Sequence, residues 1–204
     1  GHADHVHGLP FFAPLAAGRV RLRLYAGPTC APQVRTAVRA LLQPPLFPET
    51  NAPADRVAVE TLAIDAEAEV AGFFVRAVPV AHPGGACGFV VRDPASGCRV
   101  AYVSDNELAA IEGECGGRRA LLEALGGADV LLHDATYLPA ELAAHRGWGH
   151  SSYAESVRLA ADAGVRRLVL FHHHPARDDA AVDRLTHVAA RLAGASRGGG
   201  PEVT

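Results

Sequence analysis

The chain has 204 residues, of which 49% are hydrophobic and 20% are charged, and its formal net charge is −3. This composition excludes a disordered or fibrous chain, and no apolar run approaches the roughly 18 residues that cross a bilayer, so no membrane partner is expected. Because all the basic side chains are arginines and the net charge is acidic, nucleic acid is not expected as a partner either.

The first part of the chain predicts a strand and a helix. After a short apolar segment over residues 8–18, charged and apolar side chains alternate over 19–27, which is typical of a half-buried strand. Residues 31–43 predict a helix that stops before Pro44 and whose apolar face consists of Val34, Val38, Leu41 and Leu42. A stretch rich in proline and asparagine over 46–55 predicts a loop.

Four strands are predicted next, bounded by turn residues: 57–64, 72–82, 87–93 and 98–105. If residues 94–97 form the turn of the last hairpin, Cys98 faces Asp93 across it rather than Cys87. Cys87 and Cys98 are therefore not expected to form a disulfide. The lack of this disulfide fits a reducing compartment and predicts a cytoplasmic protein. The cysteines also lack a CxxC spacing, so they indicate neither a thiolate zinc site nor a redox motif.

Helices and strands alternate in the second half of the chain. Residues 118–134 predict a helix, a Gly-Gly break and a buried strand, and residues 151–173 repeat that order. Ser152 and Glu155 form a capping box at the start of the second of these helices. With a final helix near 179–192, this order predicts an α/β or α+β fold in which sheet packs against helices.

Histidine and aspartate side chains stand at the carboxyl ends of successive predicted strands: His82, Asp105, Asp134 and His172. Loops at strand ends often carry function, because the sheet holds their side chains in place. The first residues, "GHADHVHG", add His2, Asp4 and His5. Nitrogen and carboxylate donors suit zinc, with manganese or iron as alternatives. Since the set is larger than one tetrahedral ion needs, two divalent metal ions are expected, bridged by a carboxylate such as Asp105.

Six short motifs occur in an order that resembles the metallo-β-lactamase superfamily: "HADHVHGLPFF", "AHPGG", "YVSDNE", "LLHDATY", "GWGHSSY" and "LVLFHHHP". The first is similar to the end of the H-x-H-x-D-H signature of that superfamily, whose first histidine is expected immediately before Gly1. The six motifs together are most similar to the branch that contains tRNase Z and the phosphoribosyl cyclic phosphodiesterases.

This resemblance implies an αββα sandwich, with two mixed β-sheets flanked by helices and with early strands expected upstream of Gly1. One hydrolase domain is expected over residues 1–194, followed by a flexible, glycine-rich tail over 195–204. A homodimer is left open.

The resemblance also implies a role for each donor. The implied metal ligands are His2 and His82 for the first ion, Asp4, His5 and His172 for the second, and Asp105 as the bridge. Asp4 would also orient the attacking water or accept its proton. Asp134 in "HDAT" and His150 in "GHSS" match the carboxylate and the histidine that donate a proton to the leaving group in tRNase Z-like enzymes.

The expected function is a dinuclear metal-dependent hydrolase, a phosphodiesterase that cleaves a small cyclic or nucleotide-like phosphodiester with metal-activated hydroxide. A small-molecule phosphodiester is thus the expected partner. A tRNA 3′-processing endonuclease is the nearest alternative, but the hairpin between His82 and Asp105 leaves no room for a tRNA-gripping arm. A β-lactam or thioester hydrolase, which has less need of a proton-donor pair, and a metal-binding fragment without catalysis are the others.

Four further residues receive an interpretation that does not involve the metals. His133 lies within a predicted buried strand and is expected to be a hydrogen-bonded core residue. His174 is expected either beside the metal site or in solvent, and His145 on the surface. Trp148 is open to two interpretations, a stacking platform for a base and a residue that packs its own loop.

Overall fold

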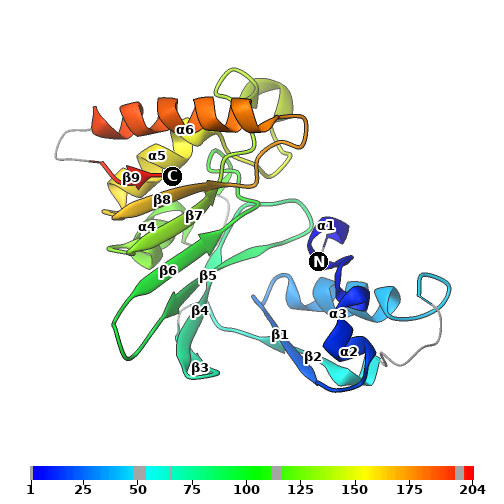
Figure 1. The fold of residues 1–204 in the computed structure, drawn as a ribbon. Helices are drawn as coiled ribbons and strands as arrows, with labels where there is room; N and C mark the ends of the chain where they lie inside the picture. Colours follow the sequence, from blue (N-terminus) through cyan, green and yellow to red (C-terminus); the bar gives the residue numbers. More distant parts are fainter. Residues whose placement is uncertain (1, 48–53, 65, 112–115, 196–199) are drawn as a thin grey trace. The chain divides into compact units, whose positions relative to one another are not determined.

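The computed structural model of the chain describes residues 2–47, 54–64, 66–111, 116–195 and 200–204 (Figure 1). They form two compact units, Gly1–Ala63 and Ile64–Thr204. The single domain over 1–194 stays a prediction. No helix among the described residues combines the length and the apolar character of a membrane-crossing segment.

The first unit is built around a short parallel sheet and one helix. β1 (Leu22–Ala26) pairs with β2 (Val57–Thr61), and α3 (Ala31–Leu41) packs against both strands. The Arg35 guanidinium donates two hydrogen bonds to the Val59 carbonyl, at 3.2 and 3.1 Å, which ties the helix to β2. The remaining elements of this unit are short: α1 (Ala3–Val6), a 3₁₀ turn (Leu9–Phe11), α2 (Ala13–Ala16) and a second 3₁₀ turn (Ala54–Arg56).

The predicted helix and strands of the first unit are confirmed, although both strands are shorter than their predicted segments. Val38 and Leu42 are buried, so the predicted apolar face of α3 is the face that packs. The apolar segment 8–18 forms short helices, which begin with proline in their first turn, where its missing N–H costs nothing. Of the predicted loop 46–55, residues 48–53 lie outside the described part of the chain.

The second unit is a seven-stranded mixed sheet flanked by helices (Figure 1). Its strands are β3 (Ala68–Val70), β4 (Phe73–Pro79), β5 (Cys87–Arg92), β6 (Arg99–Val103), β7 (Val130–Asp134), β8 (Arg167–Phe171) and β9 (Glu202–Val203). They follow chain order, antiparallel from β3 to β6 and parallel from β6 to β9. The helices are α4 (Gly117–Leu125), α5 (Tyr153–Asp162) and α6 (Asp179–Gly194), with a 3₁₀ turn at Leu142–His145. This arrangement confirms the predicted α/β class.

The core of the second unit lies where the helices pack on the sheet. α5 contacts β7 and β8, and α6 packs against α5 and β9. The largest buried apolar side chains include Val78, Val103, Leu121, Leu125, Leu131, Val157, Leu159 and Leu168. The burial of each such side chain stabilises the folded state by roughly 1.5–3 kcal/mol. This core therefore holds in place the sheet edge that carries the polar loops.

The predicted hairpin register and capping box are both confirmed. Asp93 faces Cys98, and its N–H donates to the Cys98 carbonyl at 2.9 Å. Cys98 is a free thiol. At the start of α5, the Ser152 side chain accepts from the Glu155 N–H, and the Glu155 carboxylate accepts from the Ser152 N–H at 2.9 Å.

Two edges of the sheet differ from the sequence-based expectation. β3 has only three residues, too few for alternation to reveal it. The flexible tail predicted over 195–204 is wrong at its end, because β9 pairs with β8 and Thr204 makes two backbone hydrogen bonds at 2.9 Å, with Leu168 and Leu170. Residues 196–199 of that segment lie outside the described residues.

Candidate functional site

Four of the predicted site residues lie at the carboxyl ends of strands in the second unit: His82, Asp105, Asp134 and His172. The strands that precede them, β4, β6, β7 and β8, run in the same direction, so their carboxyl ends share one edge of the sheet. Asp105 and His172 have positive φ angles of 51° and 56°. This left-handed backbone costs roughly 1–3 kcal/mol outside glycine and is concentrated at functional sites.

The donor atoms at this edge lie close together. His82, Asp105 and His150 each offer an atom within 4.8 Å of the others, and Asp134, His150 and His172 do the same. His172 Nε2 is 3.4 Å from Asp105 Oδ1. Asp105 thus lies near both His82 and His172, the two histidines whose metal ions it is predicted to bridge.

Asp134 and His150 form a buried pair. His150 Nδ1 lies 2.7 Å from Asp134 Oδ2, and the Asp134 side chain is fully buried. The same carboxylate accepts from the Thr136 hydroxyl at 2.8 Å and from the N–H groups of Thr136, Ser151 and Asn106 at 3.0, 3.3 and 3.4 Å. Asp134 is therefore held as an acceptor that fixes the proton of His150 on Nδ1. Nε2 is then the ring nitrogen that can exchange a proton.

Gly149 orients His82. The Gly149 carbonyl lies 3.0 Å from His82 Nδ1 and can accept its proton, which leaves the lone pair on Nε2, the usual arrangement of a metal-binding histidine. Gly149 has a φ of +87°, and a Cβ at this position would overlap the His82 ring. Only glycine fits, and the loop that carries His150 thereby also sets the orientation of His82.

Two buried polar residues that the sequence reasoning missed join these loops. The Glu107 carboxylate accepts from the N–H groups of Gly147 and Gly149, both at 2.9 Å, and Glu107 is 6% exposed. The Glu107 N–H donates to the Ala81 carbonyl at 2.8 Å, and the fully buried Asn106 side chain accepts from the Ala81 N–H at 3.0 Å. The motif "YVSDNE" contains both residues, but spacing does not reveal partners 40 residues away.

Thr136 orients His172. Its hydroxyl lies 3.1 Å from His172 Nδ1 and 2.7 Å from the His172 carbonyl oxygen. Nδ1 is therefore engaged within the protein, whereas Nε2 faces Asp105. This division of the two ring nitrogens is again the one that metal-binding histidines adopt.

His133 is a hydrogen-bonded core residue, as predicted. It is fully buried, with Nδ1 2.8 Å from the Ser156 hydroxyl and Nε2 3.2 Å from the Asn106 amide nitrogen. Burial lowers the pKa of His133, so the ring stays neutral and serves as a structural link between β7 and α5.

His145 is not the surface residue that the sequence predicts. It is half-buried and stacks on Tyr137, with ring centroids 4.3 Å apart and planes at 16°. His173 and His174 belong to neither of the two donor groups described above. Burial lowers the pKa of His173.

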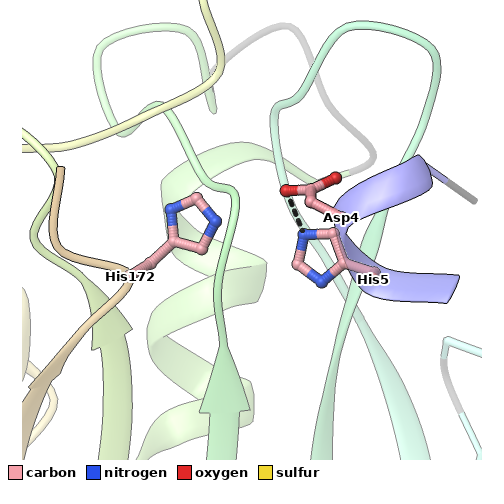
Figure 2. A group of neighbouring side chains, drawn as sticks. All are labelled: Asp4, His5 and His172. Carbon is pink, nitrogen blue, oxygen red and sulfur yellow. Dashed lines mark ion pairs between the residues drawn. The ribbon is translucent and has the colours of Figure 1, made fainter. Parts of the chain in front are cut away.

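The other three predicted ligands lie in the first unit. His2 precedes α1, and Asp4 and His5 lie on it, where Asp4 Oδ2 is 3.4 Å from His5 Nε2 (Figure 2). All three residues are exposed. Figure 2 also draws His172, which follows β8 in the second unit. The ligand roles of His2, Asp4 and His5 stay predictions.

The donor set of the second unit fits a divalent first-row metal ion. It consists of imidazole nitrogens and carboxylate oxygens, which zinc takes in catalytic sites and which manganese and iron also accept. The Asp105 side chain is 10% exposed and that of His172 is 24% exposed. These donors therefore lie at the border of the core. Hydrogen bonds within the protein orient them, and part of each side chain is accessible to solvent.

Comparisons with known proteins identify the family of the chain. Residues 1–173 match a family described as the beta-lactamase superfamily domain. A Ribonuclease Z from Bacteroides fragilis is 37% identical over 65 residues, which are 32% of this chain and 21% of that protein. The match thus spans about a fifth of the length of this curated relative.

Two solved structures share the fold. A metallo-β-lactamase fold protein from Bacillus subtilis aligns with a TM-score of 0.65 and 18% identity, over 100% of this chain and 70% of that one. The short form of human tRNase Z aligns with a TM-score of 0.59 and 21% identity, over 85% of this chain and 69% of that one. The predicted fold is therefore confirmed. The chain belongs to the beta-lactamase superfamily domain family, and part of it is similar in sequence to Ribonuclease Z proteins.

Proposed function

We propose that this chain forms the catalytic core of a metal-dependent hydrolase that cleaves phosphodiester bonds in RNA, as its relatives named Ribonuclease Z suggest. The observation that carries the proposal is the buried pair of Asp134 and His150, 2.7 Å apart, beside imidazole and carboxylate donors. Cleavage of a phosphodiester releases an alkoxide, which is a poor leaving group and needs a proton. Hydrolysis of a lactam or a thioester has less need of such a pair.

The residues proposed to bind metal are His82, Asp105 and His172, together with His2, Asp4 and His5 as the sequence predicts. Zinc is the first candidate, and manganese and iron are alternatives. When bound, such ions supply a nucleophile that is active at neutral pH and neutralise charge on the phosphoryl oxygens. Asp4 is proposed to accept the proton of the attacking water.

His150 is proposed to donate the proton to the departing oxygen from Nε2. Asp134 accepts the Nδ1 proton of His150 and stabilises the ring when it is positively charged. The sequence predicts that Asp134 shares in the donation itself. Because the Asp134 carboxylate is fully buried and accepts from the protein on both oxygens, we assign it instead to the positioning of His150.

The prediction of a small-molecule partner rather than a nucleic acid is wrong, because the curated relatives that match this chain are ribonucleases. The prediction rested on the net charge of −3, a sum over the chain that does not describe the surface around the site. Arg146, for example, is exposed four residues before His150. A few such arginines are enough to contact a single RNA strand.

A panel of substrates tests the proposal with the protein supplied with zinc or manganese. The panel contains an RNA hairpin with a single-stranded 3′ extension, bis(p-nitrophenyl) phosphate, a chromogenic cephalosporin and a thioester. We expect cleavage of the RNA and slower cleavage of the nitrophenyl ester. Hydrolysis of the cephalosporin or the thioester without any cleavage of RNA would refute the proposal.

The His150→Ala variant tests the assignment of roles. Loss of a general acid lowers kcat by roughly 100-fold to 10,000-fold, and the bound metal measured by mass spectrometry should stay unchanged. The control is His187→Ala, on the exposed surface of α6, which should match the wild type in both measurements. If His150→Ala loses metal, His150 is a ligand and the proton-transfer role is wrong.

A further inference from the structure

Trp148 is the only tryptophan of the chain, and its side chain projects into solvent two residues before His150. It is 60% exposed, although the burial of a side chain of this size is favourable by several kcal/mol. Among the described residues of the second unit, the other large apolar side chains with comparable exposure are Phe73 and Leu192, at 45% and 38%. Trp148 is thus an exposed aromatic ring beside the proposed proton donor.

The loop that carries Trp148 is held firmly on both sides. Gly147 and Gly149, with φ angles of +82° and +87°, flank the tryptophan, and the buried Glu107 carboxylate accepts from both of their N–H groups at 2.9 Å. The backbone N–H of Trp148 donates a hydrogen bond to the His145 carbonyl at 3.2 Å. The indole is therefore presented by a fixed backbone rather than by a loose loop, which reduces the entropy lost when a partner binds.

A series of rings connects the exposed indole with the proposed catalytic residue. Trp148 meets His145 edge to face at 5.2 Å, His145 stacks on Tyr137 at 4.3 Å, and Tyr137 lies 6.0 Å from His150. The His145 ring is fixed in turn, because its Nδ1 lies 2.9 Å from the Glu141 carbonyl. Ring contacts therefore run from His150 through the buried Tyr137 and through His145 to the exposed indole.

The same loop carries a positive charge. Arg146 is exposed and directly precedes the Gly147–Gly149 turn. An exposed aromatic ring and an exposed guanidinium on one loop match the chemistry of a nucleotide, whose base stacks on aromatic rings and whose phosphate binds arginine. An apolar peptide would have no use for the arginine at this position.

We propose that Trp148 stacks on a base of the RNA substrate next to the scissile phosphate, with Arg146 on the adjoining phosphate. This inference rests on the proposed function and names its substrate contact. Stacking on a fixed indole requires an unpaired base, so single-stranded RNA next to the cleavage point is preferred over duplex.

The test uses the single tryptophan as a reporter. RNA binding is measured in the His150→Ala background, which keeps the RNA intact, by anisotropy of a labelled single-stranded oligonucleotide and by quenching of the fluorescence of Trp148. We expect saturable quenching with the same midpoint as the anisotropy. Replacement of the stacked nucleotide by an abasic one should weaken binding about tenfold, since base stacking contributes about 1–3 kcal/mol.

Variants at position 148 separate stacking from general structure. Trp148→Leu should weaken binding of the intact oligonucleotide about tenfold but should bind the abasic one as the parent does, and Trp148→Phe should recover part of the loss. In the active protein, Trp148→Leu should raise KM far more than it lowers kcat. Phe73→Leu, an exposed aromatic at the opposite end of β4 from His82, is the matched control and should change binding less than about twofold.

The outcomes distinguish the inference from the function on which it rests. If RNA binds and is cleaved but the fluorescence does not change and Trp148→Leu binds normally, the stacking role is wrong and the hydrolase proposal stands. If the labelled RNA neither binds nor is cleaved, the proposed function fails and the inference fails with it. A fluorescence change that depends on protein concentration and not on RNA would overturn the inference in favour of contact with a second copy.

Discussion

At the scale of single residues, Asp134 contributes through the hydrogen bonds that its carboxylate accepts. Both of its oxygens are engaged, one with the Thr136 and Ser151 N–H groups and the other with His150. A buried carboxylate with this many donors is held in one orientation, and it imposes that orientation on the imidazole.

Asp134→Asn should therefore disable His150 without removing it. If the asparagine nitrogen replaces Oδ2, it donates to Nδ1 and reverses the tautomer, so we expect kcat to fall at least about 100-fold with little change in KM. Steady-state kinetics and a metal assay check this, with Asp162→Asn on the exposed end of α5 as the control. A fall in kcat of less than threefold would show that the pair has no part in proton transfer.

His133 makes a second residue-scale prediction, on the pH dependence of stability. Its pKa is lowered in the folded state by burial, so below about pH 6.5 the unfolded chain takes up a proton that the folded chain does not. The free energy of unfolding should accordingly be largest above pH 7 and fall as the pH drops from about 6.5 towards 5, with His133 contributing to that fall.

Urea unfolding at a series of pH values, with a chelator present, checks this. His133→Gln should be less stable than the wild type at pH 8, because it disturbs the contacts with Ser156 and Asn106. Its stability should nevertheless decline less steeply below pH 6.5. Parallel curves for the two proteins would contradict the assignment of a neutral, buried imidazole.

At the scale of elements, the turn from Gly147 to Gly149 both presents the side chain of Trp148 and orients the ring of His82. Both glycines adopt a positive φ and both N–H groups bond to Glu107, but a Cβ at 147 meets open space whereas one at 149 meets the His82 ring. The two positions thus share their backbone strain and differ in one contact.

The pair Gly147→Ala and Gly149→Ala isolates that contact. Each substitution places a side chain in the left-handed region and should cost roughly 1 kcal/mol of stability. Gly149→Ala should in addition displace His82 and lower zinc affinity at least tenfold, as loss of a supporting contact to a metal ligand does. Competition with a chromophoric chelator measures the affinity, and equal affinities for the two variants would rule out His82 as a ligand.

At the scale of the whole molecule, the net charge of −3 limits the ways in which the proposed RNA substrate could be bound. With arginine as the only basic side chain and no lysine, binding should rely on a few phosphate contacts near the site rather than on an extended basic surface. Each phosphate neutralised on a single strand contributes about 0.7 to the slope of log affinity against log salt concentration.

We therefore expect a slope of about −1 to −2 between roughly 50 and 200 mM salt, measured by anisotropy with labelled RNA. Arg146→Ala should reduce the slope by about one phosphate contact. A slope steeper than about −4 would reveal a large basic surface and contradict this account.

The sequence predicts the candidate site residues better than it predicts the residues that orient them. The shared location of His82, Asp105, Asp134 and His172 could be predicted because each stands at the carboxyl end of an apolar strand, and these strand ends converge by topology. Glu107 could not be found, since its partners are 40 and 42 residues away and only folding brings them together.

Short elements were the other limit of prediction. β9 has two residues and β3 has three, so neither shows the periodicity by which strands are recognised. Their pairing depends on a neighbouring edge that is already in place. His145 was missed for a related reason, because stacking on Tyr137 depends on the path of the turn between them rather than on polarity.

The two hydrogen bonds from Glu107 to Gly147 and Gly149 have a consequence for the diversification of this enzyme. They hold the backbone on both sides of position 148, and the side chain at that position takes no part in them. A new side chain could therefore be grafted between the glycines while His82 and His150 keep their places. If Trp148 contacts the substrate as proposed, recognition and chemistry are separable at the level of one codon, and position 148 is the natural target for redesigning substrate preference.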